Sequence, residues 1–390
     1  MNKVGEFYTP GKIIFGPGGL SQVGAEAKRL GNKVLVVLGR SAMRKSGTLD
    51  RLTHLLTENN LKYIIYENIP SDPTVETVDT GASLARKGSC NLVIALGGGS
   101  VLDTGKAISA MVANEGSVVD YQEIEGKGKK FQHKTLPFIA IPTTSGTGSE
   151  ATKNAVITNT EFSLKKSIRD PMLIPEVALV DPELTLSLPP RITAVCGGDA
   201  LTQCIESYLG KKSQEITDAL ALYAIGLIRK SLVKAVKDGK NLEARKDMAM
   251  AALLSGLCLS NSGLGAAHAL SHPLGVYYKI PHGLSCAVLL PYVMEFNLPV
   301  VTKKLAKITE YLGENISSLS ETEAAQSAIY KVKEMLSAVG IKENLSEWRI
   351  KEKNFSQLIK SAKGGSLNNN PRNTSDEDLI ELLRKMTGLY

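Results

Sequence analysis

The sequence is poor in cysteine and in aromatic residues. Its 390 residues include five cysteines and no Cys-X-X-Cys pair, which argues against a disulfide framework and against a thiolate zinc site. We interpret the five as buried thiols: Cys90, Cys196, Cys204, Cys258 and Cys286. Aromatic residues make up 5%, and the net charge of +7 is spread over lysines along the chain. Both features argue against a nucleic-acid partner.

The chain also lacks the segments that direct a protein to a membrane. No apolar run reaches about eighteen residues, and no charged-then-apolar leader follows Met1. We therefore expect a cytoplasmic protein with no membrane partner. A length of 390 residues is too great for one ordinary core, so we expect two domains.

Apolar runs alternate with helical patterns in the first half of the chain. Strands are predicted at residues 32–39, 61–69, 91–99 and 135–144, and one of the intervening helices at 74–87. This alternation predicts βαβ units and a parallel sheet. Residues 5–16, which Pro10 and Gly11 interrupt, predict a short hairpin, and extended segments at 155–159 and 177–181 complete this half.

The pattern changes after Pro189 and Pro190, where helical periodicity replaces the strand pattern. Helices are predicted at 191–209, 214–237, 241–260, 264–274, 281–296, 300–312, 321–338, 352–362 and 375–387. We therefore expect an α/β domain at 1–185 and an all-helical domain at 186–390. A ligand would lie in the crevice between them.

Two loops rich in small residues follow predicted strands. Gly97–Ser100 precede a predicted helix, so their backbone N–H groups and the helix N-terminus suit a pyrophosphate. The Gly-X-Gly-X-X-Gly pattern is incomplete, because Leu102 stands where the third glycine would be, and a purely structural turn is the alternative. The second loop spans 142–152. In a parallel sheet both loops lie at the carboxyl edge, where nucleotides bind.

Three of the five histidines lie within fifteen residues. His268 and His272 are four residues apart on one face of a predicted helix, and His282 follows a loop. This spacing suits metal ligands or acid/base groups, although ordinary core or surface histidines are the alternative. A carboxylate could come from Asp199, which shares a helix face with Gln203, or Asp199 could only cap that helix.

Together these motifs resemble the iron-containing (group III) alcohol dehydrogenases of the dehydroquinate synthase-like superfamily. The resemblance extends over essentially the whole chain through GGGSVLDTGKAI, PTTSGTGSEAT, GGDALTQCIESY, the histidine stretch and the NPR sequence at Asn370. It implies an α/β nucleotide-binding domain, an all-α C-terminal domain and NAD(P)-dependent interconversion of a small alcohol with its aldehyde or ketone. It also implies a divalent iron or zinc ion in the cleft, and we expect a homodimer.

The resemblance further implies roles for individual residues. The metal ligands correspond to Asp199, Gln203, His268 and His282. The histidines act in catalysis, with His272 as a proton relay beside the metal. Cofactor-binding positions at the pyrophosphate correspond to Gly97, Gly98, Gly99 and Ser100, with Asp103 and Lys106 in the same family motif. Those at the nicotinamide correspond to Thr143, Thr144, Thr147 and Ser149, and Lys165 or Lys166 corresponds to a lysine near the ribose.

Gln203 departs from the family pattern, because members with a bound metal usually have histidine there. An amide oxygen is a weaker ligand than imidazole, so we expect less than one metal ion per isolated chain. The alternative is a metal-independent aldehyde, keto-acid or sugar-acid reductase, as in the maleylacetate reductases. An inactive cofactor-binding protein is a third possibility. Glycerol dehydrogenases and dehydroquinate synthases share the fold, but PTTSGTGSE and NPR favour the alcohol dehydrogenase branch.

The cofactor site contains a second departure. Many NAD-using relatives have an acidic residue after the first strand, whereas this chain has Gly39, Arg40 and Ser41. No carboxylate would repel a 2'-phosphate, and Arg40 and Ser41 could bind it. We therefore expect NADP in preference to NAD. Arg40 could equally be a solvated surface residue.

Overall fold

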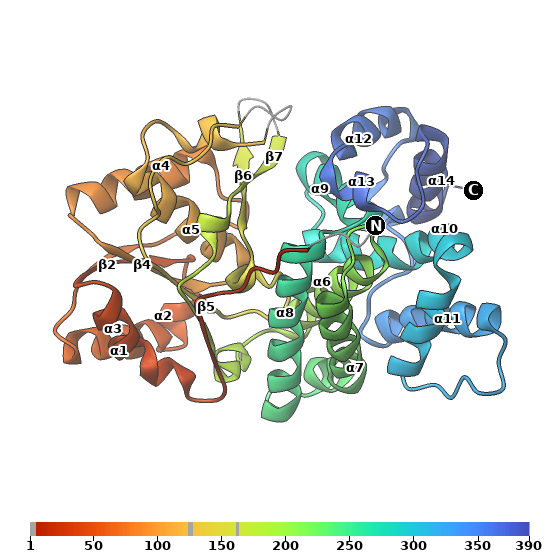
Figure 1. Ribbon diagram of the computed structural model, residues 1–390, viewed down its shortest axis with the longest axis horizontal. Helices are drawn as coiled ribbons and strands as arrows, with labels where there is room; N and C mark the ends of the chain where they lie inside the picture. Colours follow the sequence, from red (N-terminus) through yellow and green to blue (C-terminus); the bar gives the residue numbers. More distant parts are fainter. Residues whose placement is uncertain (1–4, 124–127, 161–163, 390) are drawn as a thin grey trace. The chain divides into compact units, whose positions relative to one another are not determined.

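The computed structural model describes residues 5–123, 128–160 and 164–389 (Figure 1). The chain divides into two compact units, Phe7–Ser187 and Leu188–Tyr390, the second of which also takes in Met1–Glu6. The division falls between Ser187 and Leu188, next to the proline pair that marked the change of pattern in the sequence. The first unit is α/β and the second is helical, as predicted.

The first unit is built on a six-stranded sheet of order β1-β8-β5-β4-β2-β3. Its strands are β1 (Lys12–Phe15), β2 (Lys33–Leu38), β3 (Lys62–Tyr66), β4 (Leu92–Gly97), β5 (Phe138–Pro142) and β8 (Val177–Val180). All neighbouring strands pair in parallel, which confirms the predicted parallel sheet. Every residue of β4 and β5 is buried, because helices cover both faces.

Two apolar cores lie on opposite faces of this sheet. The helices are α1 (Val23–Leu30), α2 (Ala42–Lys45), α3 (Thr48–Glu58), α4 (Val75–Lys87) and α5 (Gly99–Ala113). Helices α4 and α5 pack on one face with alternate residues of β2 such as Leu35 and Val37. Helices α1 and α3 pack on the other face with Val34 and Val36. The alternation along β2 is the strand period of two.

The sequence predictions fail at two places in this unit. Residues 5–16 do not form a hairpin, because β1 pairs in parallel with β8 from the far end of the unit. Strand β7 (Leu164–Arg169) was not predicted, and it pairs antiparallel with β6 (Asn154–Asn159) in a separate two-stranded sheet. Long-range pairing decides β1, and short local patterns do not contain it, whereas β7 pairs with the strand that directly precedes it in the chain.

The second unit consists of helices in its described part. These are α6 (Pro190–Leu209), α7 (Glu215–Lys237), α8 (Leu242–Ser262), α9 (Ala266–Tyr278), α10 (His282–Tyr311), α11 (Glu321–Ala338), α12 (Phe355–Ala362), α13 (Gly365–Asn369) and α14 (Asp376–Thr387). The separate helices predicted at 281–296 and 300–312 are joined in α10 across a kink at Val301. The short α13 was not predicted.

Helices α6 and α10 form the centre of the second unit. Helix α6 is buried along almost its whole length, and it packs against α7, α8 and α10. Among the described residues, α10 is long and apolar enough to cross a membrane, and α8 with α9 would pass the same test only as a pair bent by 103°. Because 61% of the apolar window of α10 is buried within the protein, a core helix accounts for its composition.

Candidate metal centre and cofactor loop

Four possible metal donors converge in the helical unit. Asp199 lies on α6, His268 on α9, and His282 and Cys286 on α10. One ligand atom from each residue lies within 4.8 Å of the other three. Three of the residues are buried and His282 is partly exposed. The structure thus brings together the predicted Asp199, His268 and His282, and it adds a cysteine that we had interpreted as an ordinary buried thiol.

Close packing of α10 against α6 places two of these donors. His282 and Cys286 are four residues apart, so they share a face at the start of α10. The intervening Gly283 lies directly against α6: a Cβ atom there would be 2.6 Å from the carbonyl oxygen of Val195 and 3.0 Å from Cβ of Asp199. Any larger side chain would push the first turn of α10 away from the cluster.

The hydrogen bonds of His268 direct one ring nitrogen into the cluster. Its Nδ1 lies 2.6 Å from Oε2 of Glu206, and an ionised carboxylate only accepts hydrogen bonds, so Nδ1 carries the proton. The Nε2 lone pair then faces Asp199 Oδ1 at 3.4 Å. Both of these buried atoms lack an ordinary hydrogen bond within the described residues. Carboxylate support of this kind is typical of histidines that bind metals.

His282 is oriented in the same way by Ser271. The hydroxyl of Ser271 donates to the carbonyl oxygen of His268 at 2.9 Å, so it accepts from Nδ1 of His282 at 3.2 Å. Nε2 of His282 is left with its lone pair, 3.8 Å from Asp199 Oδ1 and 3.7 Å from Sγ of Cys286. Both imidazoles therefore present Nε2 to the same point.

Charges within the cluster outweigh the effect of burial. Burial alone would raise the pKa of Asp199, but His268 and His282 hold it below its ordinary value. The same two imidazoles lower the pKa of the buried Cys286 thiol. Burial would lower the pKa of His268, yet Cys286 and Glu206 raise it well above its ordinary value. A carboxylate oxygen, a cysteine sulfur and two imidazole nitrogens are donors that a divalent cation binds, so the residues fit a metal.

Gln203 lies one turn after Asp199 on α6, beside the cluster. Its Nε2 donates to Asp199 Oδ2 at 3.2 Å, and its Oε1 accepts from the hydroxyl of Ser255 at 2.8 Å. The carboxylate cannot donate, so this orientation of the amide follows from its partners. Gln203 thus orients Asp199, whereas its role as a metal ligand stays a prediction.

His272 lies on α9 next to the four donors. Its ring centroid is 5.3 Å from that of His282, and the side chain is partly exposed. It is not one of the four converging donors. A position between the cluster and the surface is compatible with a proton relay, which stays a prediction.

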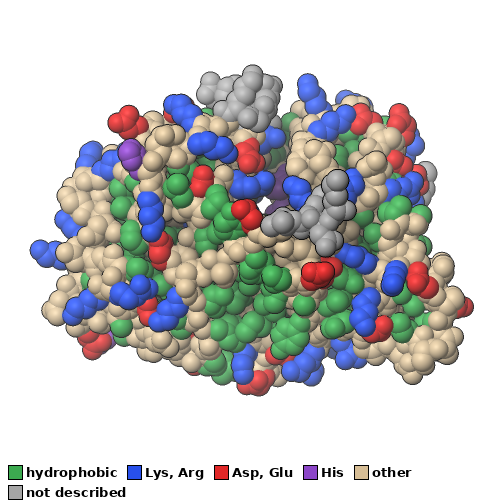
Figure 2. Space-filling view, in the orientation of Figure 1, with side chains coloured by type: hydrophobic (Ala, Val, Ile, Leu, Met, Phe, Trp, Pro, Cys, Tyr) green, Lys and Arg blue, Asp and Glu red, His purple; other side chains and the backbone are tan. Residues whose placement is uncertain are grey.

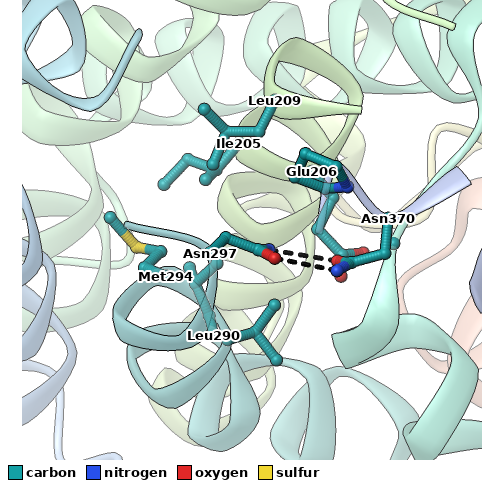
Figure 3. Close-up of a pocket in the computed structure, with 10 residues that line it drawn as sticks. Ile205, Glu206, Leu209, Leu290, Met294, Asn297 and Asn370 are labelled. Carbon is teal, nitrogen blue, oxygen red and sulfur yellow. Dashed lines mark hydrogen bonds between the residues drawn. The ribbon is translucent and has the colours of Figure 1, made fainter. Parts of the chain in front are cut away.

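Glu206 is a further site residue that we did not predict. Besides its contact with His268, it accepts from the backbone N–H of Ala267 at 2.6 Å through Oε1. Behind it lies a small cavity in which Asn297 and Asn370 exchange two hydrogen bonds of 3.0 and 2.8 Å (Figure 3). The NPR residue Asn370 and Glu206 thus support the first turn of α9. The spacing of Glu206, seven residues after Asp199 on one helix face, was the available signal.

The glycine run of the α/β unit forms the turn between β4 and α5. Strand β4 ends at Gly97, α5 begins at Gly99, and no side chain caps this helix. A Cβ atom on Gly98 would lie 3.3 Å from Thr144, and one on Gly99 would lie 2.7 Å from Thr147. The two predicted cofactor loops are therefore in close contact, and open N–H groups at the start of α5 suit an anion.

Other predicted cofactor residues support this loop. Asp103 accepts from Ser149 Oγ at 2.5 Å and from the N–H of Val156 at 2.9 Å. The buried Lys106 donates to the carbonyl oxygens of Ser149 and Asn154. These bonds attach the loop at 142–152 to α5. Direct contact of Asp103 or Ser149 with a cofactor stays a prediction.

The remaining predicted cofactor residues are divided between the two sheets, with Thr143 after β5 of the large sheet and Lys165 and Lys166 on β7 of the small one. The N–H of Thr143 donates to Gly97, Lys165 pairs with Asp72 at 2.7 Å, and Lys166 lies opposite Ile157 in the β6–β7 pair.

The predicted adenosine-side residues Gly39, Arg40 and Ser41 follow β2, which is the neighbour of β4. Arg40 and Ser41 are exposed, and a Cβ on Gly39 would meet only Val101, at 3.6 Å. The turn after β2 therefore has room for a ligand group. Lysine and arginine side chains elsewhere are dispersed among acidic ones over the face seen in Figure 2.

Comparison with known proteins gives matches over nearly the whole chain. Residues 10–182 match the iron-containing alcohol dehydrogenase family, and residues 193–387 match the C-terminal region of Fe-containing alcohol dehydrogenases. The 1,3-propanediol dehydrogenase of Klebsiella pneumoniae is 36% identical over 97% of this chain and 98% of its own. The NAD-dependent methanol dehydrogenase of Bacillus methanolicus is 35% identical, with the same shares of each chain. A crystal structure of a 1,3-propanediol oxidoreductase superposes with a TM-score of 0.95 at 36% identity, covering 98% of this chain and 100% of that one.

Proposed function

Because this chain belongs to the iron-containing alcohol dehydrogenase family, we propose that it interconverts a small alcohol and its aldehyde or ketone by hydride transfer at a nicotinamide cofactor. The observation that carries this proposal is the convergence of Asp199, His268 and His282, with both imidazole Nε2 lone pairs directed at one point. A divalent metal ion bound there supplies a Lewis acid for the substrate oxygen.

Each residue of the cluster has a distinct task. Asp199, His268 and His282 would hold the metal. Glu206 keeps the proton of His268 on Nδ1 and thereby keeps Nε2 available. His272, partly exposed beside His282, would pass the alcohol proton to solvent. Such a proton transfer contributes on the order of 100- to 10,000-fold to rate.

We propose the turn between β4 and α5 as the site of the cofactor pyrophosphate, and NADP as the preferred cofactor. The uncapped start of α5 supports the first point. The second rests on Arg40 and Ser41, whose exposed side chains follow β2 where no carboxylate would repel a 2'-phosphate. The B. methanolicus relative is named NAD-dependent, so the ratio of kcat/KM for NADPH and NADH is the measurement that matters.

Absorbance of the reduced cofactor with a panel of small alcohols and aldehydes tests the activity. We expect turnover that a chelator abolishes and added zinc or ferrous ion restores. Cofactor binding without turnover on any alcohol or aldehyde would contradict the proposal and indicate an inactive cofactor-binding protein. Turnover that resists the chelator in metal-free protein would indicate the metal-independent reductase, with His268, His272 and His282 polarising the substrate. A homodimer and a cytoplasmic location stay predictions.

A further inference from the structure

Both polar ends of the Gln203 amide have partners within the protein. Its nitrogen donates to Asp199 and its oxygen accepts from Ser255. Turning the oxygen toward the cluster would place a carbonyl oxygen against an oxygen of the Asp199 carboxylate, which can only accept hydrogen bonds. The contact that a ligand at this position needs is therefore absent, and the site needs a donor from elsewhere.

Cys286 lies where that donor is needed. It is fully buried, one turn after His282, with Sγ 3.7 Å from the His282 Nε2 atom. Other buried cysteines in this unit have different surroundings: Sγ of Cys258, for example, donates to the carbonyl oxygen of Thr217 at 3.4 Å. Cys286 instead faces the Nε2 atoms of His268 and His282, whose rings carry their proton on Nδ1.

We propose that the Cys286 thiolate, and not Gln203, is the fourth protein ligand of the metal, together with Asp199, His268 and His282. Binding a divalent ion displaces the thiol proton to solvent and forms a metal–sulfur bond, with no change of oxidation state. Gln203 keeps the role of orienting Asp199. The proposal rests on the proposed function only in identifying this cluster as the metal site.

Distances within the cluster support this donor set. Zinc–oxygen and zinc–nitrogen bonds of about 2.1 Å and a zinc–sulfur bond of about 2.3 Å place neighbouring tetrahedral donors about 3.4 to 3.6 Å apart. In this cluster Asp199 Oδ1 lies 3.4 Å from His268 Nε2 and 3.8 Å from His282 Nε2. The distance from His282 Nε2 to Cys286 Sγ is 3.7 Å. Shifts of a few tenths of an ångström would complete the shell.

The thiolate alters the metal occupancy expected from the sequence and also bears on the choice of metal. A shell of four protein donors would hold metal near one ion per chain, in place of the partial occupancy expected from Gln203 alone. Thiolate is also a softer ligand than an amide oxygen, so it favours zinc over harder cations. A fifth position would still be open to substrate, because zinc can expand to five ligands.

Cobalt substitution of the full-length protein tests the assignment without relying on activity. The protein is stripped with a chelator and titrated with Co²⁺, and its near-ultraviolet spectrum is followed for sulfur-to-cobalt charge transfer. We expect this band in the wild type, its loss in Cys286→Ser, and its retention in the matched Cys258→Ser and in Gln203→Ala. Competition titrations should give at least about 100-fold weaker zinc binding in Cys286→Ser, and about 10-fold weaker binding in Gln203→Ala, where only support of a ligand is lost.

The wild-type spectrum decides the matter even if a variant does not fold. Bound cobalt without the charge-transfer band, or no cobalt binding at all, would overturn the assignment. A band that survives in folded Cys286→Ser would overturn it as well. Turnover measured on the same samples separates the two proposals. Chelator-sensitive activity without the charge-transfer band would support the alcohol dehydrogenase function and contradict the Cys286 ligand. The band without turnover would support the Cys286 ligand and contradict the alcohol dehydrogenase function.

Discussion

The two units of this protein build their candidate sites from different parts of the chain. In the α/β unit the site is a short, continuous turn of backbone at Gly97–Ser100, supported by the loop at 142–152. In the helical unit the site consists of side chains from α6, α9 and α10. The first and last of these residues, Asp199 and Cys286, are almost ninety positions apart in the sequence. A backbone site depends on glycine at a few adjacent positions, whereas a side-chain site depends on how helices pack.

Buried ionisable groups behave differently in the two units as well. In the metal cluster, attraction between the groups outweighs burial, so the pKa of Asp199 lies below and that of His268 well above its ordinary value. In the α/β unit burial dominates at Glu150, whose pKa rises to about 7 although Lys106 and a backbone hydrogen bond oppose the rise. Several ionisable groups that converge on one point indicate a ligand-binding site. A single buried ionisable group such as Glu150 indicates a lower free energy of unfolding at the pH where the group would ionise in water.

The largest expected effect is on the side-chain site. His268→Ala removes a metal donor and leaves the buried Oε2 atom of Glu206 without its imidazole partner. We expect loss of stoichiometric metal and a fall in kcat/KM of about 1,000-fold, because the Lewis acid for the substrate oxygen would be lost with the metal. Metal analysis and steady-state kinetics measure both. His54→Ala, at an exposed position of α3, is the matched control and should change neither.

If His268→Ala kept its metal and its activity, the helical unit would have no metal site of this kind. Cofactor affinity should be unchanged in the variant, because the glycine turn belongs to the other unit. If His268→Ala also lost cofactor binding, the two candidate sites would not be independent of each other.

Different parts of this architecture were accessible from the sequence to different degrees. The parallel sheet and the change to helices after Pro190 followed from periodicity, because both are local properties. Strand β1 was misassigned as part of a hairpin, because its partner β8 lies more than 160 residues away. Pairing over such a distance leaves no trace in the local pattern.

The same reasoning explains what was missed in the metal cluster. The histidines and Asp199 stand in recognisable local motifs. Cys286 was dismissed because no second cysteine lies near it, although its spacing from His282 was visible. Its proximity to Asp199 depends on the close approach of α10 to α6 at Gly283, which is a property of packing.

Glu150 gives the next largest effect, on stability. Below pH 4.5 the carboxyl is protonated in both the folded and the unfolded chain. As pH rises to about 7 only the unfolded chain ionises, so the free energy of unfolding decreases by up to about 3 kcal/mol. Glu150→Gln should match the wild type at pH 4.5 and be the more stable at pH 8. Urea unfolding across this range measures the difference.

The exposed Glu58→Gln serves as the control for Glu150 and should show no such trend with pH. Equal stability of Glu150→Gln and wild type at pH 8 would mean that burial does not dominate at this carboxyl. The contrast drawn between single and clustered ionisable groups would then fail.

Gly98→Val tests the backbone site. A Cβ atom there would already lie 3.3 Å from Thr144, and the valine methyl groups would extend over the N–H groups at the start of α5. We expect about 100-fold weaker cofactor binding, equivalent to about 2.7 kcal/mol, with metal content unchanged. Fluorescence titration with NADPH measures it. Gly365→Ala, where a Cβ atom would meet open space, should bind normally, and unchanged affinity in Gly98→Val would remove the turn from the cofactor site.

The smallest effect concerns cofactor choice at the end of β2. The space around Gly39 accepts an aspartate, since a Cβ atom there would meet only Val101, at 3.6 Å. The added carboxylate can accept hydrogen bonds from ribose hydroxyls and repels a 2'-phosphate. Gly39→Asp should therefore shift the NADP to NAD ratio of kcat/KM roughly tenfold toward NAD, or about 1.4 kcal/mol. Arg40→Ala should weaken NADPH alone, because only the phosphate would contact the guanidinium. Two results together would contradict this assignment: a wild type that already prefers NAD, and an Arg40→Ala variant that binds both cofactors as the wild type does. Arg40 would then be a solvated surface residue, and the backbone site would contact only the pyrophosphate of the cofactor.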